Sequence, residues 1–111
     1  MVGVGLSLGL HLLRESRIEV PRRVDGSTLT LEPRGVLWFA TVARLERQIL
    51  DALAAQPDVD TLKIDLGGCG RVDFTAASVL RRLGDAAQSA GLQVEITRIP
   101  SNVARHLDNF S

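Results

Sequence analysis

A glycine-rich turn flanked by aspartates is the stretch of this chain whose residue types and spacing best suit chemistry. It runs from Asp65 through Gly67 and Gly68 to Asp73 and Thr75. The apolar residues before it predict a buried strand, and the residues after it predict the start of a helix. Because N–H groups and the positive end of the helix dipole point out of a helix start, an anion or a partner can bind there. The candidate contact residues are Asp65, Gly67, Gly68, Asp73, Thr75 and Ala76.

Two known phosphate-binding loops do not match this turn. A Walker loop needs G-x-x-x-x-G-K-[ST], and a dinucleotide fingerprint needs G-x-G-x-x-G opening directly into a helix. The glycines are sufficiently explained by a sharp turn that needs positive φ. Asp73 and Thr75 are likewise explained as helix caps, each worth roughly 0.5–2 kcal/mol. Contact with an anion or a nucleotide at this helix start is therefore a secondary expectation.

No catalytic constellation is predicted. Asp65 and Asp73 are the one carboxylate pair that the turn can bring together, and such pairs share a proton or hold a metal. No further ligands accompany them, and His11 and His106 lack zinc-site spacing. A Cys69–His106 nucleophile pair has no local signature. We therefore expect a protein that is not an enzyme and that holds neither a metal nor a cofactor.

Overall composition indicates one small domain. The chain has 111 residues, and its 13 basic residues balance its 13 acidic residues. Because no net positive charge attracts phosphates, nucleic acid is not an expected partner. The single Cys69 excludes an internal disulfide and fits a reducing compartment.

The N-terminus is apolar and then basic. Residues 2–13 carry no full charge, and four arginines follow at positions 14, 17, 22 and 23. As a helix, twelve residues span about 18 Å, short of the roughly 30 Å hydrocarbon core. Two interpretations remain open: an amphipathic segment packed on the domain, or the end of a transmembrane helix whose arginines mark the cytoplasmic side.

Hydrophobic spacing predicts a small α/β fold. The expected strands are 28–32, 36–39, 61–66 and 93–97, and the expected helices are 42–53, 76–90 and 101–110. The turn at 33–35 should close a hairpin between the first two strands, and strand 36–39 should be covered on both faces. Ser101 is expected to cap the last helix. The predicted buried helix positions are Val42, Leu45, Ile49, Leu80, Leu83, Ala87, Ala90, Val103, Leu107 and Phe110.

The predicted fold class is therefore α/β, with a small mixed sheet of four to five strands. An N-terminal hairpin is followed by βαβ units, and the helices lie mainly on one face.

The pattern over residues 28–110 resembles the STAS domain family. Three segments carry the resemblance: Ile64-Asp65-Leu66 before the glycine turn, Val72-Asp73-Phe74-Thr75-Ala76-Ala77 after it, and Ile99-Pro100-Ser101-Asn102-Val103. Gly35-Val36-Leu37-Trp38-Phe39-Ala40 is similar to the strand-to-helix step of SulP STAS domains. STAS domains occur as stand-alone anti-sigma-factor antagonists and as the cytoplasmic C-terminal domain of SulP-type anion transporters.

Phe74 distinguishes these two branches. In antagonists, the residue after the aspartate is a serine that a partner kinase phosphorylates, and Phe74 cannot accept phosphate. Thr75 and Ser78 are the nearby hydroxyls that remain as candidate phosphorylation sites, and Ala76 replaces the family's glycine. The resemblance therefore implies a SulP-type transporter domain, with the soluble antagonist as the alternative.

On this interpretation residues 1–27 are the end of a transmembrane helix plus a basic linker, and residues 28–111 are the STAS domain. The implied location is the cytoplasmic face of the plasma membrane. The implied partners are the protein's own membrane domain, a neighbouring protomer or a cytosolic regulatory protein.

Overall fold

The computed structural model describes residues 18–111. The predicted membrane segment at residues 2–13 lies outside this range. The strands are β1 (Arg22–Asp25), β2 (Thr28–Leu31), β3 (Gly35–Leu37), β4 (Thr61–Asp65), β5 (Cys69–Val72) and β6 (Gln93–Thr97). The helices are α2 (Phe39–Ala55), α3 (Phe74–Ser89) and α4 (Ala104–Leu107), with short 3₁₀ turns η1 (Leu66–Gly68), η2 (Ser101–Val103) and η3 (Asp108–Phe110). Within residues 18–111 no helix is long and apolar enough to cross a bilayer.

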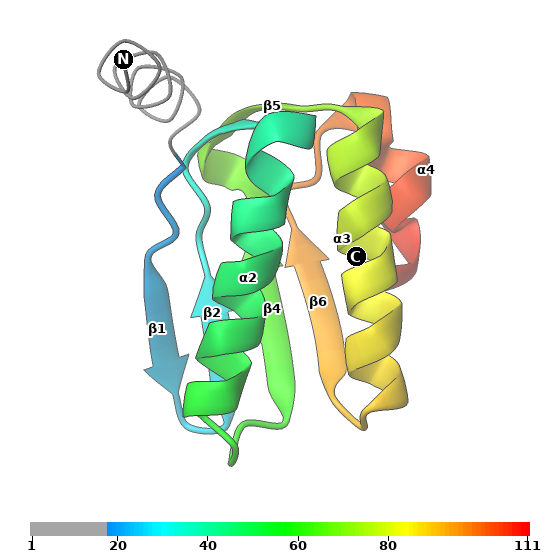
Figure 1. Cartoon of the computed structure of the whole chain (residues 1–111). Helices are drawn as coiled ribbons and strands as arrows, with labels where there is room; N and C mark the ends of the chain where they lie inside the picture. The colour runs from blue at the N-terminus through cyan, green and yellow to red at the C-terminus, as the bar shows by residue number, and fades with distance from the viewer. Residues whose placement is uncertain (1–17) are drawn as a thin grey trace, which may run out of the picture.

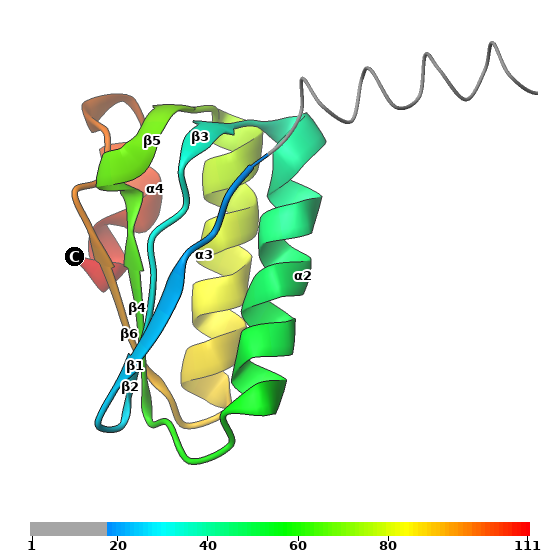
Figure 2. The same ribbon diagram turned by 90° about the vertical axis from the view of Figure 1, so that its left-hand side faces the viewer.

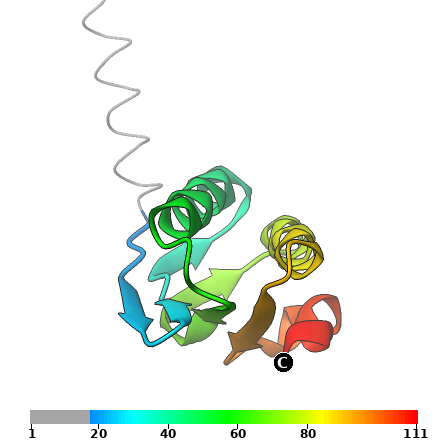
Figure 3. The same cartoon turned by 90° about the horizontal axis from the view of Figure 1, so that it is seen from below.

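Two sheets organise the fold. The larger one has the order β1-β2-β4-β6, with β1 antiparallel to β2 and the other pairs parallel. The smaller one is the parallel pair β3-β5. Helices α2 and α3 cover one face of the larger sheet, and α4 lies beside α3 next to β6 (Figures 1 and 3). The predicted mixed α/β fold with helices mainly on one face is confirmed.

The core lies between this sheet and its two long helices. Alternate residues of β2 and β4 point toward the helices, and Leu29, Leu31, Leu62 and Ile64 are at most 1% exposed. Burying each such side chain contributes roughly 1.5–3 kcal/mol. The alternate positions carry polar residues on the uncovered face, and Thr30 pairs there with Lys63.

The predicted hairpin is wrong. β2 pairs with β1, which precedes it, through a turn in which Gly26 has φ of +62°. Residues 22–25, interpreted from the sequence as linker, thus form the outer strand. β3 leaves β2 and pairs with β5 in the second sheet (Figure 2). The expected cover on both faces of strand 36–39 is also wrong, because Val36 is 48% exposed, Trp38 is the N-cap of α2 and Phe39 begins that helix.

Three smaller expectations fail. The glycine turn contains a short strand, β5, which the sequence did not indicate. Ala90 is exposed because α3 ends at Ser89. Ser101 makes no capping hydrogen bond, since Pro100 precedes a 3₁₀ turn at that point. The other predicted buried helix positions are confirmed.

Gly84 lets the C-terminus close over α3. A Cβ built on Gly84 lies 2.6 Å from the ring of Phe110, which is 2% exposed. The ring thus occupies the space that any side chain at position 84 would need.

We expect Gly84→Ala to lower the free energy of unfolding by about 1–2 kcal/mol, because overpacking outweighs the gain in helix propensity. In a Phe110→Ala background the same substitution should instead be stabilising by about 0.5–1 kcal/mol, since the collision is gone. Urea unfolding of the four proteins measures both effects. An identical sign in the two backgrounds would contradict this packing.

Candidate functional site

One carboxylate joins the starts of the two long helices. Asp73 Oδ1 accepts a hydrogen bond from the Ala76 N–H at 2.8 Å and caps α3. Its Oδ2 accepts from the Phe39 N–H at 3.2 Å, at the first residue of α2. The Asp73 N–H in turn donates to the Leu37 carbonyl at 3.1 Å, where β3 ends. Asp73 therefore satisfies N–H groups on both helices and supplies negative charge at their positive ends.

The start of α2 has a second anchor. The Thr41 hydroxyl donates to the Val36 carbonyl at 2.9 Å and accepts from the Trp38 N–H at 3.1 Å. On the other side, the Asn102 side-chain amide donates to the Val72 carbonyl at 2.9 Å, which attaches η2 to the end of β5. These bonds fix the backbone around both helix starts.

An apolar surface, which we call the aromatic rim, surrounds Asp73. It consists of Val36, Trp38, Phe39 and Phe74. Phe39 is 64% exposed and Phe74 is 59% exposed. The Trp38 and Phe39 rings meet edge-on at 4.8 Å, and Phe74 packs on the His106 ring at 5.2 Å. Three of the rim residues, Val36, Trp38 and Phe74, border a hollow of about 360 Å³ together with Arg71 and Asn102.

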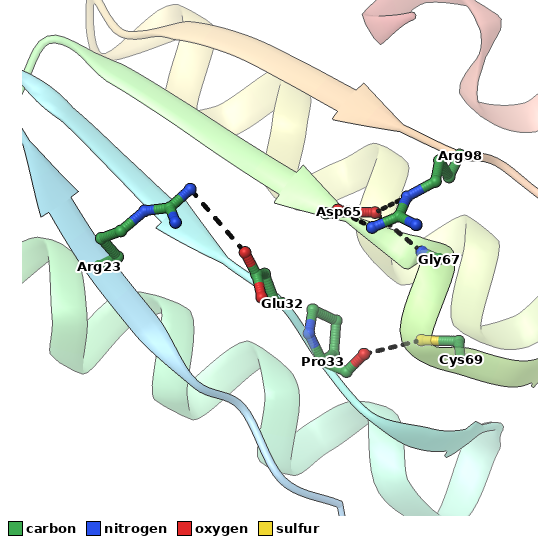
Figure 4. A network of polar contacts seen from close by, with 7 residues as sticks. All are labelled: Arg23, Glu32, Pro33, Asp65, Gly67, Cys69 and Arg98. Atoms are coloured by element: carbon green, nitrogen blue, oxygen red, sulfur yellow. Dashed lines mark hydrogen bonds and ion pairs between the residues drawn. The ribbon is translucent and has the colours of Figure 1, made fainter.

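A separate polar cluster lies where β4 ends. The Arg98 guanidinium binds the Asp65 carboxylate through two hydrogen bonds, with Nε at 2.8 Å from Oδ1 (Figure 4). The Gly67 N–H donates to the same Oδ1 at 2.9 Å. The hydrogen bond from Arg98 is the main reason why the pKa of Asp65 is lowered below its ordinary value, and the pKa of Arg98 is raised in return.

Gly67 lies in close contact with this pair, so a larger residue there would have to displace the Arg98 side chain. A Cβ on Gly67 would overlap the Arg98 guanidinium. Gly67 does not have positive φ, so the predicted reason for this glycine is wrong. Arg98 itself has φ of +52°, which few non-glycine residues adopt.

Nucleophilic chemistry at Cys69 is disfavoured. Its thiol donates to the Pro33 carbonyl at 3.5 Å, and burial raises the pKa of the thiol to about 11 (Figure 4). A protonated thiol is a poor nucleophile. His106 faces Phe74 rather than a cysteine, and no cluster of His, Cys, Asp and Glu within residues 18–111 has the make-up of a metal site.

The predicted contact residues divide into two groups. Asp65, Gly67 and Gly68 border a hollow of about 200 Å³ beside Arg98, together with Glu32 and Arg34. The other three predicted residues stand at the start of α3, where Asp73 caps the helix, Thr75 is exposed and Ala76 is buried. Asp65 and Asp73 have different hydrogen-bond partners and do not form the pair that the turn was considered able to bring together.

Sequence reasoning missed Arg98, Asn102, Trp38 and Phe39 as members of these groups. The only signal for Arg98 was its position directly after a strand, at the same sheet edge as Asp65. Trp38 and Phe39 were assigned to a buried strand, so their exposure at a helix start was not foreseen.

The mixed sheet with its helices mainly on one face is the fold of a STAS domain. A family model described as Mlab, STAS domain, matches residues 21–110, so the chain belongs to the STAS family. Among proteins with curated descriptions, none matches the chain significantly in sequence.

Solved structures show the same fold. Murine Solute Carrier 26 family member A9, an anion transporter in its inward-facing state, matches with a TM-score of 0.68 at 16% identity over 97% of this chain. A second structure of SLC26A9 gives 0.65, also at 16% identity and 97% coverage. A structure described as Mglu gives 0.58 at 22% identity over 73% of this chain. This chain spans 21%, 22% and 19% of those chains, respectively.

Asp73→Ala should lower the free energy of unfolding by about 1–2 kcal/mol, because it leaves N–H groups on two helices without an acceptor. Asp73→Asn retains a carboxamide oxygen and should cost less. Asp85→Ala, at an exposed position on the same helix, is the matched control and should change stability by less than about 0.5 kcal/mol. Urea unfolding measures all three, and equal losses for Asp73→Ala and Asp85→Ala would contradict the shared cap.

Arg98→Gln should raise the pKa of the Asp65 carboxyl toward the ordinary value of about 3.9, as measured by ¹³C NMR titration. Because the folded-state pKa lies below the unfolded one, the stabilisation by this pair is complete above pH of about 4. It is lost as the pH falls through the folded value, and this acid dependence should shrink in the variant. Arg23→Gln, which removes a looser pair with Glu32 at 3.9 Å, should leave the pKa of Asp65 unchanged.

Proposed function

We propose that this chain is the cytoplasmic STAS domain of a SulP-type anion transporter, acting as a regulatory and protein-interaction module. Phe74 carries the proposal, because the family's phosphorylated serine is replaced by an exposed aromatic ring. An apolar ring at this place suits constant contact rather than a charge switch. The likeness in fold to SLC26A9, a relative of SulP transporters, supports the same class.

The proposed organisation assigns residues 1–27 to the end of a membrane helix and its linker and residues 28–111 to the domain, except that residues 22–25 belong to the domain's sheet as β1. The domain then stands at the cytoplasmic face of the plasma membrane. The linker before Arg22 therefore leads directly into β1, the outer strand of the larger sheet.

The proposed partners are the transporter's own membrane domain, a neighbouring protomer or a cytosolic regulator. The surface offered to them is the glycine turn and the start of α3, where Thr75 is exposed beside Phe74. Contact of an anion or a nucleotide with the first N–H groups of α3 is a separate proposal, which the Asp73 carboxylate opposes at that point because it already accepts the Ala76 N–H. Nucleotide titration followed by amide NMR tests it, and unmoved signals for residues 67–78 would remove it.

The DNA upstream of the Met1 codon tests the proposal that this chain is a transporter domain. We expect the reading frame to continue upstream and to encode ten or more apolar spans of about 20 residues each. Sequencing of the genomic locus and of the transcript measures this. A start codon with its own ribosome-binding signal at Met1 would sink the transporter proposal.

The alternative is a soluble antagonist of an anti-sigma factor, switched by phosphorylation. The observation in its favour is that Thr75 and Ser78 are both exposed near the start of α3. Incubation with a cognate kinase, followed by mass spectrometry, separates the two functions. Phosphate on Thr75 or Ser78, abolished by Thr75→Val or Ser78→Ala, would favour the antagonist, and no incorporation is expected for a transporter domain.

A further inference from the structure

The aromatic rim holds most of the aromatic surface of this chain. The sequence has four aromatic residues of the Phe, Trp and Tyr types, and Phe110 is the one in the core. The other three are Trp38, Phe39 and Phe74, gathered with Val36 at the starts of α2 and α3. Exposed rings in one place are costly in water, so a surface of this kind marks a contact.

The N-terminal segment joins the fold at the same end. Glu19 and Arg34 exchange backbone hydrogen bonds at 2.7 and 3.2 Å, directly before β3 leads to the rim. In Figures 1 and 2 the blue start of the described chain lies at the end where α2 and α3 begin. In sequence, the uncharged stretch 2–13 ends only a few residues before Glu19, which is paired with Arg34.

Charge at the rim matches an anionic surface. Arg71 is exposed and borders the same hollow as Phe74, whereas Arg34 borders the other hollow with Glu32 and Asp65. The carboxylate that the rim surrounds, that of Asp73, accepts hydrogen bonds from N–H groups at the starts of α2 and α3. An arginine beside a half-buried Trp and two exposed Phe rings is a composition found on surfaces that lie at the boundary between headgroups and acyl chains.

We propose that the aromatic rim contacts an anionic phospholipid bilayer, with Trp38, Phe39 and Phe74 at the headgroup boundary and Arg71 near phosphates. This rests on the proposed function in one respect, because residues 2–13 are taken as the membrane tether. A bilayer is favoured over a protein partner because the described chain begins at the end of the fold that carries the rings and Arg71.

Trp38 is the only tryptophan, so its fluorescence reports on the rim in the full chain. We expect the chain to sediment with vesicles of phosphatidylcholine containing about one-third phosphatidylglycerol. Trp38 emission should then shift to shorter wavelength, be quenched by brominated phosphatidylcholine, and lose its accessibility to acrylamide.

A relocated tryptophan is the matched control. Leu50 is 52% exposed on α2, eleven residues beyond Phe39 and thus about 16 Å along the helix. In Trp38→Phe/Leu50→Trp, the new tryptophan should stay open to acrylamide and unquenched by brominated lipid. Phe39→Ser/Phe74→Ser should weaken vesicle binding on the order of tenfold, while Leu50→Ser should leave it unchanged. Circular dichroism confirms that each variant is folded.

Three results would overturn the proposal. In the first, the chain sediments with vesicles, but Trp38 is not quenched by brominated lipid and stays accessible to acrylamide. This result would show that only residues 2–13 bind the bilayer, and it would leave the proposed function intact. Protection of Trp38 from both quenchers would assign the rim to a protein contact. No sedimentation at all would remove both the tether and the rim contact, whereas the upstream reading frame tests the transporter class independently.

Discussion

The arrangement of this domain depends on the Asp73 carboxylate and its two helix N–H partners. α2 and α3 come from different halves of the chain, yet each begins at an oxygen of the same side chain. A helix start leaves several N–H groups without partners, so one acceptor shared between two starts also holds them side by side. The Asp73 N–H also donates to the Leu37 carbonyl at the end of β3, so the cap of both helices is attached to the small β3-β5 sheet. The two most exposed rings of the aromatic rim, Phe39 and Phe74, are the first residues of these two helices.

The long elements were predictable because their burial follows a simple period. Apolar residues at helical spacing located α2 and α3, and alternation located β4 and β6. β1 was missed because all four of its residues are exposed, so no apolar alternation distinguishes it from a linker. β5 was missed because only Val72 among its residues is buried. The false hairpin arose because Pro33-Arg34-Gly35 looks like a tight turn, although β3 finds its partner 32 residues or more away in sequence.

The candidate site was predictable in part for the same reason. Capping chemistry is local, so Asp73 was identified correctly as a cap of α3, while its second bond to α2 depends on tertiary packing. Arg98 was invisible because its partner Asp65 is 33 residues earlier and on a different strand. Exposure of Trp38 and Phe39 likewise depends on where α2 begins, which their apolar character concealed. A helix cap formed within one segment was thus predictable from the sequence, whereas hydrogen bonds between distant segments were not.

The backbone of Arg98 has a consequence for the way the chain leaves the sheet. An L-residue with positive φ costs roughly 1–2 kcal/mol, and a glycine at position 98 would avoid that cost. A glycine there would lose the guanidinium that binds Asp65, so one residue both forms the backbone bend after β6 and holds the carboxylate at the end of the neighbouring strand β4. A few residues later, Asn102 attaches the same segment to the Val72 carbonyl at the end of β5. The segment that follows β6 is thus held to two other strands by side chains on either side of Pro100.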